Sequence, residues 1–208
     1  MDFPYNIILG SYNREDYLQR VTYKVTTDSV TEPVTLAAAK LHLKMDDIDA
    51  EDTLIDSLII SARMFAENFT NRAFVTKTIT QVYNEFPSSD KVLRLAVTPL
   101  QAVVSVNYND ENGVVQTWDA SNYIVDAYTE PSEISVKNSI SFPSTIDEKN
   151  AVTVIYTAGY GTADDVPQPI KQAILLLIGH FYNHREDTVS EKRTAAERLL
   201  KQYRVSRN

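Results

Sequence analysis

PQPIKQAILLLIGHFYNHRE, residues 167–186, is the stretch of sequence that decides the fold of this chain. Proline is tolerated in the first turn of a helix, so Pro167 and Pro169 predict a helix start, and charged residues mark the other end. Apolar residues at three- and four-residue spacing predict a buried stripe: Ile170, Ala173, Ile174, Leu177, Ile178 and Phe181. Leu175 and Leu176 extend the apolar surface to a second face. A helix this apolar on two sides is either deeply buried or covered by another subunit.

A second long helix is predicted far upstream, over Asp52–Thr70. Its apolar residues form one wide stripe: Leu54, Ile55, Leu58, Ile59, Ala62, Phe65, Ala66 and Phe69. A shorter helix, Leu36–Leu43, comes before it with Thr35 as its N-cap. The acidic link over residues 45–52 is expected to cap the free N–H groups of the long helix and to interact with the positive end of its dipole. The two long helices are predicted to close on each other.

Between the long helices the periodicity changes to alternation of two residues, which is typical of strands. From Ala73 onward, one predicted face carries Val75, Lys77, Ile79, Gln81 and Tyr83. Further short strands are predicted at Val92–Leu95, Ala102–Tyr108, Val114–Trp118, Tyr123–Val125, Glu133–Val136 and Ala151–Thr157. Asn112-Gly113 predicts a hairpin turn, and Gly159-Tyr160-Gly161 predicts a turn with positive φ. Regular short strands with turn signals favour a small antiparallel sandwich or barrel.

These patterns predict an α+β fold. N-terminal and C-terminal helices form a bundle, a small antiparallel β-sandwich or barrel-like region is inserted between them, and extended arms are expected at both termini. The predicted segments are an N-terminal arm (1–32), the first half of the helical part (33–72), the inserted β domain (73–161), the second half of the helical part (162–186) and a C-terminal arm with a short helix (187–208).

The two terminal segments differ in character. Residues 1–32 are polar, but Val21–Val25 alternates enough for one strand, so this region is either an arm that a neighbour orders or a disordered terminus. Glu191–Tyr203 predicts a short charged helix, too weakly apolar for a core element. Residues 185–208 hold seven Lys/Arg and four Asp/Glu, a net of +3, whereas the rest of the chain has a net charge of −11. The tail is therefore expected to seek an acidic protein surface.

The composition excludes several classes of function. The net charge is −8, and a groove that grips nucleic acid needs Lys and Arg, so the chain is expected to surround DNA at most, without binding it. The absence of cysteine excludes disulfides, thiolate metal sites and cysteine nucleophiles. The N-terminus does not resemble a signal peptide, and no apolar run approaches the ~20 residues of a membrane span. We expect a soluble protein made in the cytosol.

Neither metal motif that the sequence suggests is complete. His180 and His184 have the spacing of zinc ligands, but no general base lies between them and nothing selects a third ligand, such as Glu186 or His42. Counted from Asp47, the acidic link lacks the glycine and the glutamate that a calcium loop requires at its sixth and twelfth positions. We therefore expect no metal site and no cofactor.

No catalytic motif is complete either. The Gly159–Gly161 turn lacks the lysine and the later glycines of phosphate-binding loops, and no Gly-x-Ser-x-Gly elbow is present. The carboxylates cluster over residues 46–56 at a helix start, without an apolar pocket that would tune them for acid–base work. We expect a protein that works by assembly, not an enzyme.

Several stretches together resemble the head–tail connector (adaptor) proteins of tailed phages. They are PVTLAAAKLHL (33–43), DTLIDSLI (52–59) with Ala62, TNRA (70–73), TPLQAV (98–103), VTVIYTAGYG (152–161) and VPQPIKQAILLL (166–177), followed by Tyr182 and Arg185-Glu186. The resemblance covers about residues 31–205, in the right order. The departures are the long N-terminal arm, 1–30, and the short linker after Asp187.

The resemblance implies a homo-oligomeric ring, usually of twelve subunits, beneath the portal of the filled capsid. Genomic DNA would pass through its centre without specific binding, and the β region would meet the next tail or neck component. The protein would be located in the virion neck, and in the host cytoplasm during assembly. In such proteins the C-terminal segment reaches the portal, which assigns portal docking to Arg198, Leu199, Leu200, Lys201, Tyr203 and Arg204.

Three other hypotheses stay open at this point. The chain could be another neck or tail-terminator ring protein, whose partner would be the tail tube. It could be a metal-dependent hydrolase centred on His180 and His184. It could also be a monomeric cellular binding module built on a β-sandwich.

Overall fold

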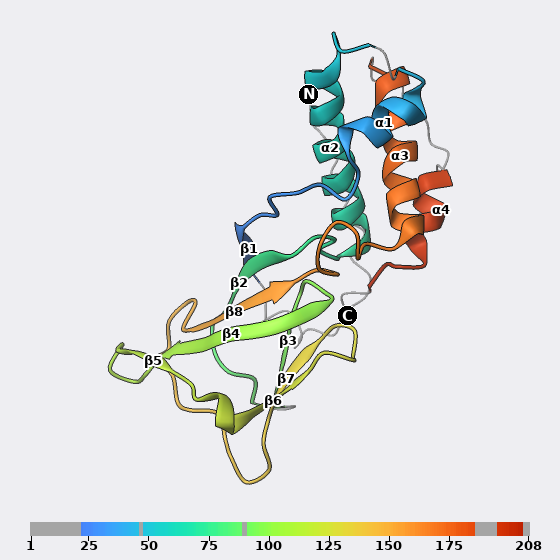
Figure 1. The fold of residues 1–208 in the computed structure, drawn as a ribbon. Coiled ribbons are helices and arrows are strands. Elements are labelled where there is room, and N and C mark those ends of the chain that lie inside the picture. The colour runs from blue at the N-terminus through green and yellow to red at the C-terminus, as the bar shows by residue number, and fades with distance from the viewer. Residues whose placement is uncertain (1–21, 46–47, 89–90, 186–194, 206–208) are drawn as a thin grey trace, which may run out of the picture.

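The computed structural model describes residues 22–45, 48–88, 91–185 and 195–205 of the chain. Its helices gather at one end of an elongated molecule and its strands at the other (Figure 1). The helical end combines segments from both halves of the chain. The segment between them supplies every strand that the structure describes apart from β1 (Thr22–Thr27). This arrangement confirms the predicted α+β class. Residues 1–21 of the predicted N-terminal arm and 191–194 of the predicted tail helix lie outside the described residues.

Four α-helices are described, α1 (Leu36–Leu43), α2 (Asp52–Thr70), α3 (Gln168–Asn183) and α4 (Ala195–Lys201). The Thr35 hydroxyl accepts a hydrogen bond from the backbone N–H of Ala38 at 3.2 Å, which confirms Thr35 as the N-cap of α1. Asn71 ends α2 in the left-handed conformation, with φ of 57°. Pro167 sits at the N-cap of α3, followed by a first turn that contains Pro169.

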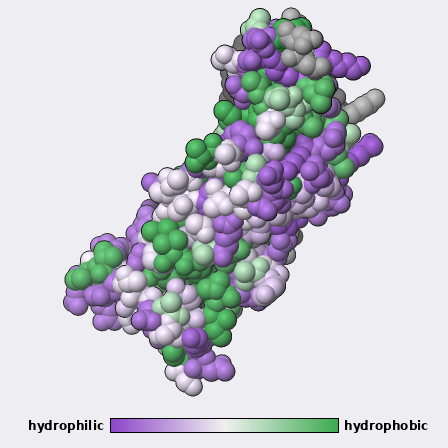
Figure 2. Space-filling model, viewed as in Figure 1, coloured by the Kyte–Doolittle hydropathy of each residue, from purple (hydrophilic) through white to green (hydrophobic). Residues whose placement is uncertain are grey.

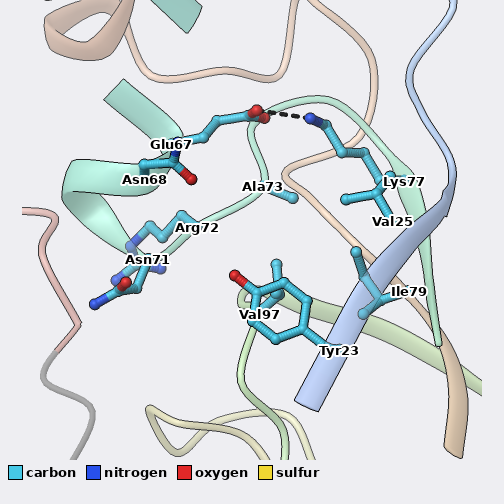
Figure 3. A pocket seen from close by; sticks show the side chains of 10 residues that line it. All are labelled: Tyr23, Val25, Glu67, Asn68, Asn71, Arg72, Ala73, Lys77, Ile79 and Val97. Atoms are coloured by element: carbon cyan, nitrogen blue, oxygen red, sulfur yellow. Dashed lines mark hydrogen bonds and ion pairs between the residues drawn. The ribbon is translucent and has the colours of Figure 1, made fainter. Parts of the chain in front are cut away.

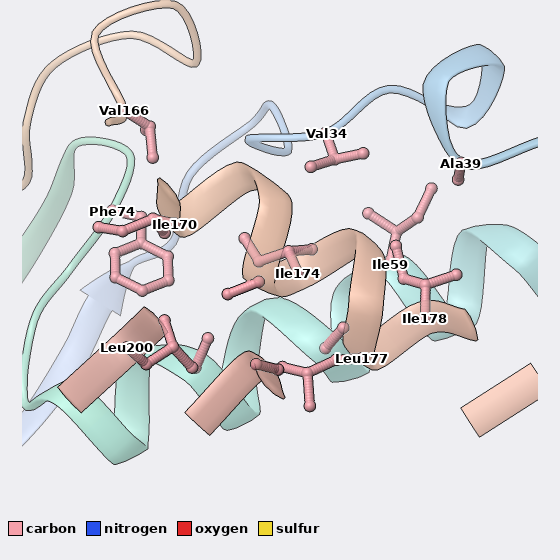
Figure 4. Close-up of a cluster of buried hydrophobic side chains, with 14 of the residues drawn as sticks. Val34, Ala39, Ile59, Phe74, Val166, Ile170, Ile174, Leu177, Ile178 and Leu200 are labelled. Atoms are coloured by element: carbon pink, nitrogen blue, oxygen red, sulfur yellow. The ribbon is translucent and has the colours of Figure 1, made fainter. Parts of the chain in front are cut away.

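The helical end has its own hydrophobic cluster (Figure 4). The predicted stripe of α3 is buried from Ile170 to Ile178 and packs against the buried stripe of α2. One expected core residue is placed differently, because Phe65 is 39% exposed. Its ring lies 6.3 Å from that of Phe69 and meets Phe181 edge-on at 6.4 Å. Phe65 therefore borders the cluster and does not fill it.

The tail helix α4 belongs to this cluster, which corrects the expectation that it lies outside the core. Leu200 is 0% exposed, and in Figure 4 it lies close to Phe74 at the lower end of α2. Ala196 is also buried, and Leu199 and Tyr203 pack against the cluster from outside. A helix as short as α4 is not stable by itself. These four apolar residues stabilise it because they pack against the two longer helices.

Within the described residues of the acidic link, no side chain caps the N-terminus of α2, contrary to expectation, although Asp52 lies in the first turn, where its charge suits the helix dipole as expected. Glu51 occupies the N-cap position but makes no capping hydrogen bond with its carboxylate. That carboxylate accepts hydrogen bonds from the Tyr182 hydroxyl and from Arg185 at the far end of α3. Asp49 and Asp52 instead bind the Lys40 ammonium of α1, at 2.6 and 2.8 Å. The link therefore ties three helices together at one end.

In the described part of the chain, eight strands form two antiparallel sheets at the other end of the molecule. Besides β1, they are β2 (Lys77–Tyr83), β3 (Val92–Arg94), β4 (Leu100–Asn109), β5 (Val115–Thr117), β6 (Tyr123–Asp126), β7 (Glu133–Val136) and β8 (Val152–Ala158). The larger sheet has the order β1-β2-β8-β4-β5 and the smaller one β3-β7-β6. β2 alternates between buried and half-exposed residues along its whole length, as the two-residue pattern predicts.

A second hydrophobic cluster fills the space between these sheets. Both contribute fully buried residues, such as Ile79 and Val106 from the larger sheet and Ile134 from the smaller one. Gln81 is also 0% exposed, and its side-chain oxygen accepts hydrogen bonds from the Tyr156 hydroxyl at 3.0 Å and from the Ala96 N–H at 2.9 Å. A buried amide with its partners in place fixes the alignment of the surrounding strands.

The turn at Gly159-Tyr160-Gly161 joins the two ends of the molecule. Gly159 and Gly161 have φ of 135° and 134°, as the two glycines predict. A Cβ on Gly159 would lie 2.8 Å from the backbone of Val75 and Thr76, so only glycine fits. The Tyr160 N–H donates to the Phe74 carbonyl at 2.9 Å. The turn thereby leads β8 back to the helical cluster and to the start of α3.

Candidate functional site

The predicted docking residues lie on α4 and the turn that follows it. Arg198, Lys201 and Arg204 are exposed, whereas Leu199 and Tyr203 are half-buried. Leu200 faces the helical cluster and is not part of the surface. The structure therefore divides the predicted set into three exposed cations, two residues at the border of the core and one core residue. We call Arg198, Lys201 and Arg204 the basic face.

The end of the chain is held at the junction between helices and sheets. The Val205 N–H donates to the Thr70 carbonyl at 3.0 Å, and the Asn71 side chain donates to the Val205 carbonyl at 2.8 Å. Arg72 donates to the Tyr203 carbonyl at 2.6 Å. Three hydrogen bonds, to Thr70, Asn71 and Arg72 at the end of α2, thus fix the backbone next to the basic face.

Arg72 connects this clamp to the β end. Its guanidinium also binds the Glu130 carboxylate with two nitrogens, one of them at 2.6 Å. A bidentate pair of this kind fixes the relative orientation of the guanidinium and the carboxylate, and it is stronger than a hydrogen bond between neutral groups. Arg72 could not be recognised as a connecting residue from the sequence, because its partners lie 58 and 131 positions away in the chain.

A second group of charges is buried beside the same junction. Arg63 and Lys77 both bind the Glu67 carboxylate, at 2.9 and 2.6 Å, and all three residues are at most 9% exposed. Glu67 also accepts a hydrogen bond from the Phe74 N–H at 3.0 Å. Glu32 binds Arg63 at 2.7 Å and Asp28 binds Lys77 at 2.9 Å. We call these five charged residues the junction network.

The junction network holds the segment after β1 against α2 and β2. The side chains of β1 are mostly exposed, so backbone pairing with β2 and these ion pairs supply most of its attachment. A signal for the network was present in the sequence, since Arg63 and Glu67 are four residues apart and border the apolar stripe of α2, next to Ala62 and Ala66. Charged residues on a buried face are rare unless they are paired.

Beside the network lies a small recess between β1, β2 and the end of α2 (Figure 3). Figure 3 shows Glu67 and Lys77 bonded at one side of it and Tyr23, Val97 and Ile79 at the other. Its volume is about 60 Å³, enough for a few water molecules but far below the size of a typical ligand pocket. The recess therefore does not indicate a small-molecule site.

The network predicts that the stability of the fold depends on pH in the acid range. Burial alone would raise the pKa of Asp28, but the hydrogen bond and charge of Lys77, with the charge of Arg63, lower it below its ordinary value. A carboxyl whose pKa is lowered in the folded state stabilises the protein at pH values above the pKa that it has in the unfolded chain. This stabilisation is lost as the pH falls through the lowered pKa of the folded state.

We therefore expect the free energy of unfolding to decrease as the pH falls below about 4, and Asp28→Asn to make that decrease shallower. Urea unfolding at a series of pH values measures it. Asp147→Asn removes the same charge on an exposed loop and serves as the control. If Asp28→Asn and Asp147→Asn have the same pH profile, Asp28 does not contribute to the acid response.

His180 and His184 lie at the C-terminal end of α3. The rings of His180 and His184 lie 4.5 Å apart, and the His184 Nδ1 is 2.9 Å from the His180 carbonyl. No group of three metal-ligating side chains occurs within the described part of the chain, and Glu186 lies outside it. In the same ranges, no helix is both long and apolar enough to cross a membrane.

The comparisons with known proteins agree with a role in assembly. The sequence model of the head completion protein family matches residues 34–196, and the chain belongs to this family. A search of curated protein sequences found no match. The family confirms the resemblance to head–tail connector proteins that the sequence analysis stated.

Solved structures share most of this fold. A chain from the neck of an empty gene transfer agent (GTA) particle, computed with C6 symmetry, has a TM-score of 0.77 and 20% identity, over 90% of this chain and 97% of that one. A chain from the virion of the native GTA particle has a TM-score of 0.77 and 19% identity, over 89% and 96%. A chain from the native neck computed with C12 symmetry has a TM-score of 0.68 and 17% identity, over 89% and 97%.

Proposed function

We propose that this chain is a structural protein of the virion neck that forms a closed ring of identical subunits, twelve in number, at the head–tail interface. The observation that carries the proposal is the shared fold: the chain matches almost the full length of a chain from a particle neck computed with twelvefold symmetry. Membership of the head completion protein family supports the same role. The ring docks on the portal, extends the DNA channel and provides the attachment site for the next tail or neck component.

In this proposal the basic face makes the contact with the portal. Arg198, Lys201 and Arg204 are exposed on a backbone that three hydrogen bonds hold in place. Leu199 and Tyr203 supply apolar area at the border, and Leu200 supports the face from inside the core. An exposed cationic surface on an otherwise acidic protein favours an acidic partner surface.

The charge of the rest of the chain suits a conduit for DNA. The 28 Asp and Glu outnumber the 20 Lys and Arg, so the net charge of −8 repels phosphates and DNA passes without being held. A structural role of this kind requires no catalysis, and we expect no enzymatic activity. The alternative is that this chain forms another neck or tail-terminator ring. Its partner would then be the tail tube, and the chain would not bind the portal.

We expect the wild-type protein to co-sediment with purified portal protein and the triple variant Arg198→Glu/Lys201→Glu/Arg204→Glu to lose this binding. Reversing three charges changes attraction to repulsion across an interface, while exposed positions contribute little to folding. The matched control reverses three exposed lysines elsewhere, Lys24, Lys91 and Lys149.

Circular dichroism melting of each variant checks that folding is intact. Binding of the triple variant at wild-type strength would remove the basic face from the proposal. Wild-type protein that binds the tail tube and not the portal would support the terminator alternative.

A further inference from the structure

Residues 22–32 lie on the surface of the subunit where the helical end meets the strands, and we call them the strap. The strap consists of β1 and the residues that follow it up to Glu32. Among the β1 side chains, only Tyr23 is half-buried and packs against the hydrophobic cluster between the sheets. Figure 2 shows a mostly hydrophilic surface between the hydrophobic residues of the helical end and those among the strands, which is where β1 lies in Figure 1. The burial of apolar side chains therefore contributes little to holding the strap in place.

The strap also borders two hollows in the subunit. One is the recess of about 60 Å³ between β1, β2 and the end of α2 (Figure 3). The other is an open groove of about 530 Å³, which Val30 and Thr31 of the strap line together with Thr76 and the turn at 161–165. Val30 is 100% exposed, and the buried Ser29 hydroxyl has no hydrogen-bond partner among the described residues. Atoms that border a hollow lose dispersion contacts on that side, so close packing does not hold the strap either.

Two carboxylates of the strap bind cations of the junction network. Asp28 binds Lys77 at 2.9 Å and Arg63 at 3.5 Å, and Glu32 binds Arg63 at 2.7 Å. The side chains of Asp28 and Glu32 are 54% and 26% exposed, whereas that of Glu67, which binds the same cations from α2, is 9% exposed. Salt screens exposed charges far more than buried ones. Salt is therefore expected to weaken the ion pairs of the strap while those of Glu67 persist.

We propose that the strap opens as one unit while the rest of the subunit stays folded, and that Asp28 and Glu32 form the latch that keeps it closed. Local opening occurs in segments with few buried apolar contacts and solvent-exposed backbone hydrogen bonds. Among the described strands β1 pairs only with β2, so its opening breaks one strand pairing and leaves the pairing of β2 with β8 in place. Pro33 and Val34 are buried just before α1 and fix the end of the strap that stays attached.

Opening of the strap changes the charge of the junction. With the strap closed, Arg63 and Lys77 have three carboxylates around them. Once Asp28 and Glu32 leave, Glu67 alone remains between the two cations, so the charge beside β2 changes from net negative to net positive. The edge of β2 also loses its neighbouring strand, and its backbone groups become free to pair. The strap opens within a single subunit, so this switch does not depend on the ring of the proposed function.

Hydrogen exchange of the backbone amides of the full chain, measured by mass spectrometry against unstructured peptides of the same sequence, tests the latch. A rise from about 0.1 M to about 1 M salt should speed the exchange of residues 22–32 about threefold or more, because the Debye length falls to about 3 Å. At low salt Asp28→Asn/Glu32→Gln should speed it about tenfold or more, with the amides of α3 and β8 unchanged. The matched control Asp147→Asn/Glu148→Gln removes the same charges from an exposed loop and should exchange as the wild type does.

A covalent lock should produce the opposite change. The hydroxyls of Thr26 and Thr80 are hydrogen-bonded to each other across β1 and β2, so cysteines at these two positions lie close enough for a disulfide. The chain contains no cysteine of its own that could compete. In oxidised Thr26→Cys/Thr80→Cys protein the strap should exchange about tenfold more slowly than in the reduced form and should lose its dependence on salt, because the disulfide prevents β1 from leaving β2.

Two results would overturn the proposal. If the strap exchanges as slowly as β8 in the wild type, or if Asp28→Asn/Glu32→Gln speeds both equally, the strap separates only when the whole subunit unfolds. If Asp28→Asn/Glu32→Gln exchanges as Asp147→Asn/Glu148→Gln does, the two carboxylates are not a latch. Binding to the portal is measured separately by co-sedimentation, so neither result bears on the proposed function.

Discussion

Replacing Glu67 with alanine is expected to lower the free energy of unfolding by about 3–5 kcal/mol. The carboxylate binds both Arg63 and Lys77, at 2.9 and 2.6 Å, and its removal leaves two buried cations without their shared partner. The substitution also leaves the Phe74 N–H without its acceptor. Urea unfolding followed by circular dichroism measures the effect, and the result tells whether the junction network stabilises the connection between helices and sheets.

Two further variants make this measurement specific. Glu67→Gln keeps an acceptor for the Phe74 N–H but removes the charge, so its effect should fall between those of the wild type and Glu67→Ala. Glu133→Ala breaks the more exposed pair with Arg94, 3.2 Å apart, and should cost at most about 1 kcal/mol. If Glu67→Ala costs no more than Glu133→Ala, solvent reaches the network and it is not a buried one.

Leu200→Ala is expected to cost about 2–5 kcal/mol, the range for a leucine removed from a packed core. Leu200 is 0% exposed and lies in the helical cluster beside residues of α2 and α3. The same unfolding experiment measures the effect. A large loss of stability would establish that α4 is part of the folded subunit before any partner binds.

The neighbouring residue Arg198 provides the matched control on the same helix. Arg198 is exposed, so Arg198→Ala should change the free energy of unfolding by no more than about 0.5 kcal/mol. If Leu200→Ala and Arg198→Ala both change the free energy of unfolding by the same small amount, α4 does not pack on the helical cluster. It would then be an arm outside the core, as its composition alone suggested. For the same reason, deletion of residues 190–208 is unsuitable as a test of docking, because it would remove core residues together with the basic face.

The strands and the two long helices could be predicted closely from the sequence. Glu133–Val136 was expected and is found with the same bounds, and β2 alternates as expected, with Lys77, Ile79, Gln81 and Tyr83 on its buried face. The stripe of α3 from Ile170 to Ile178 is likewise buried as predicted. Each of these features follows from periodicity within a few residues, which is a property of the local sequence.

The charged groups were harder to place. Arg63 and Glu67 look like surface residues by composition, yet they are buried because Lys77, Asp28 and Glu32 reach them from three other segments. The acidic link was expected to cap a helix, but Lys40 and Arg185 attract its carboxylates instead. The choice between a cap and an ion pair depends on which cation the fold brings near, and the local sequence does not contain that information.

By itself the sequence determined the α+β class, the positions of the elements and the family resemblance, because hydrophobic spacing and turn residues act over short distances. Only the tertiary structure decided that α4 lies in the core and that its three cations form an exposed face on a clamped backbone. The physical reason is that the burial of a side chain depends on the groove or partner that distant segments build around it.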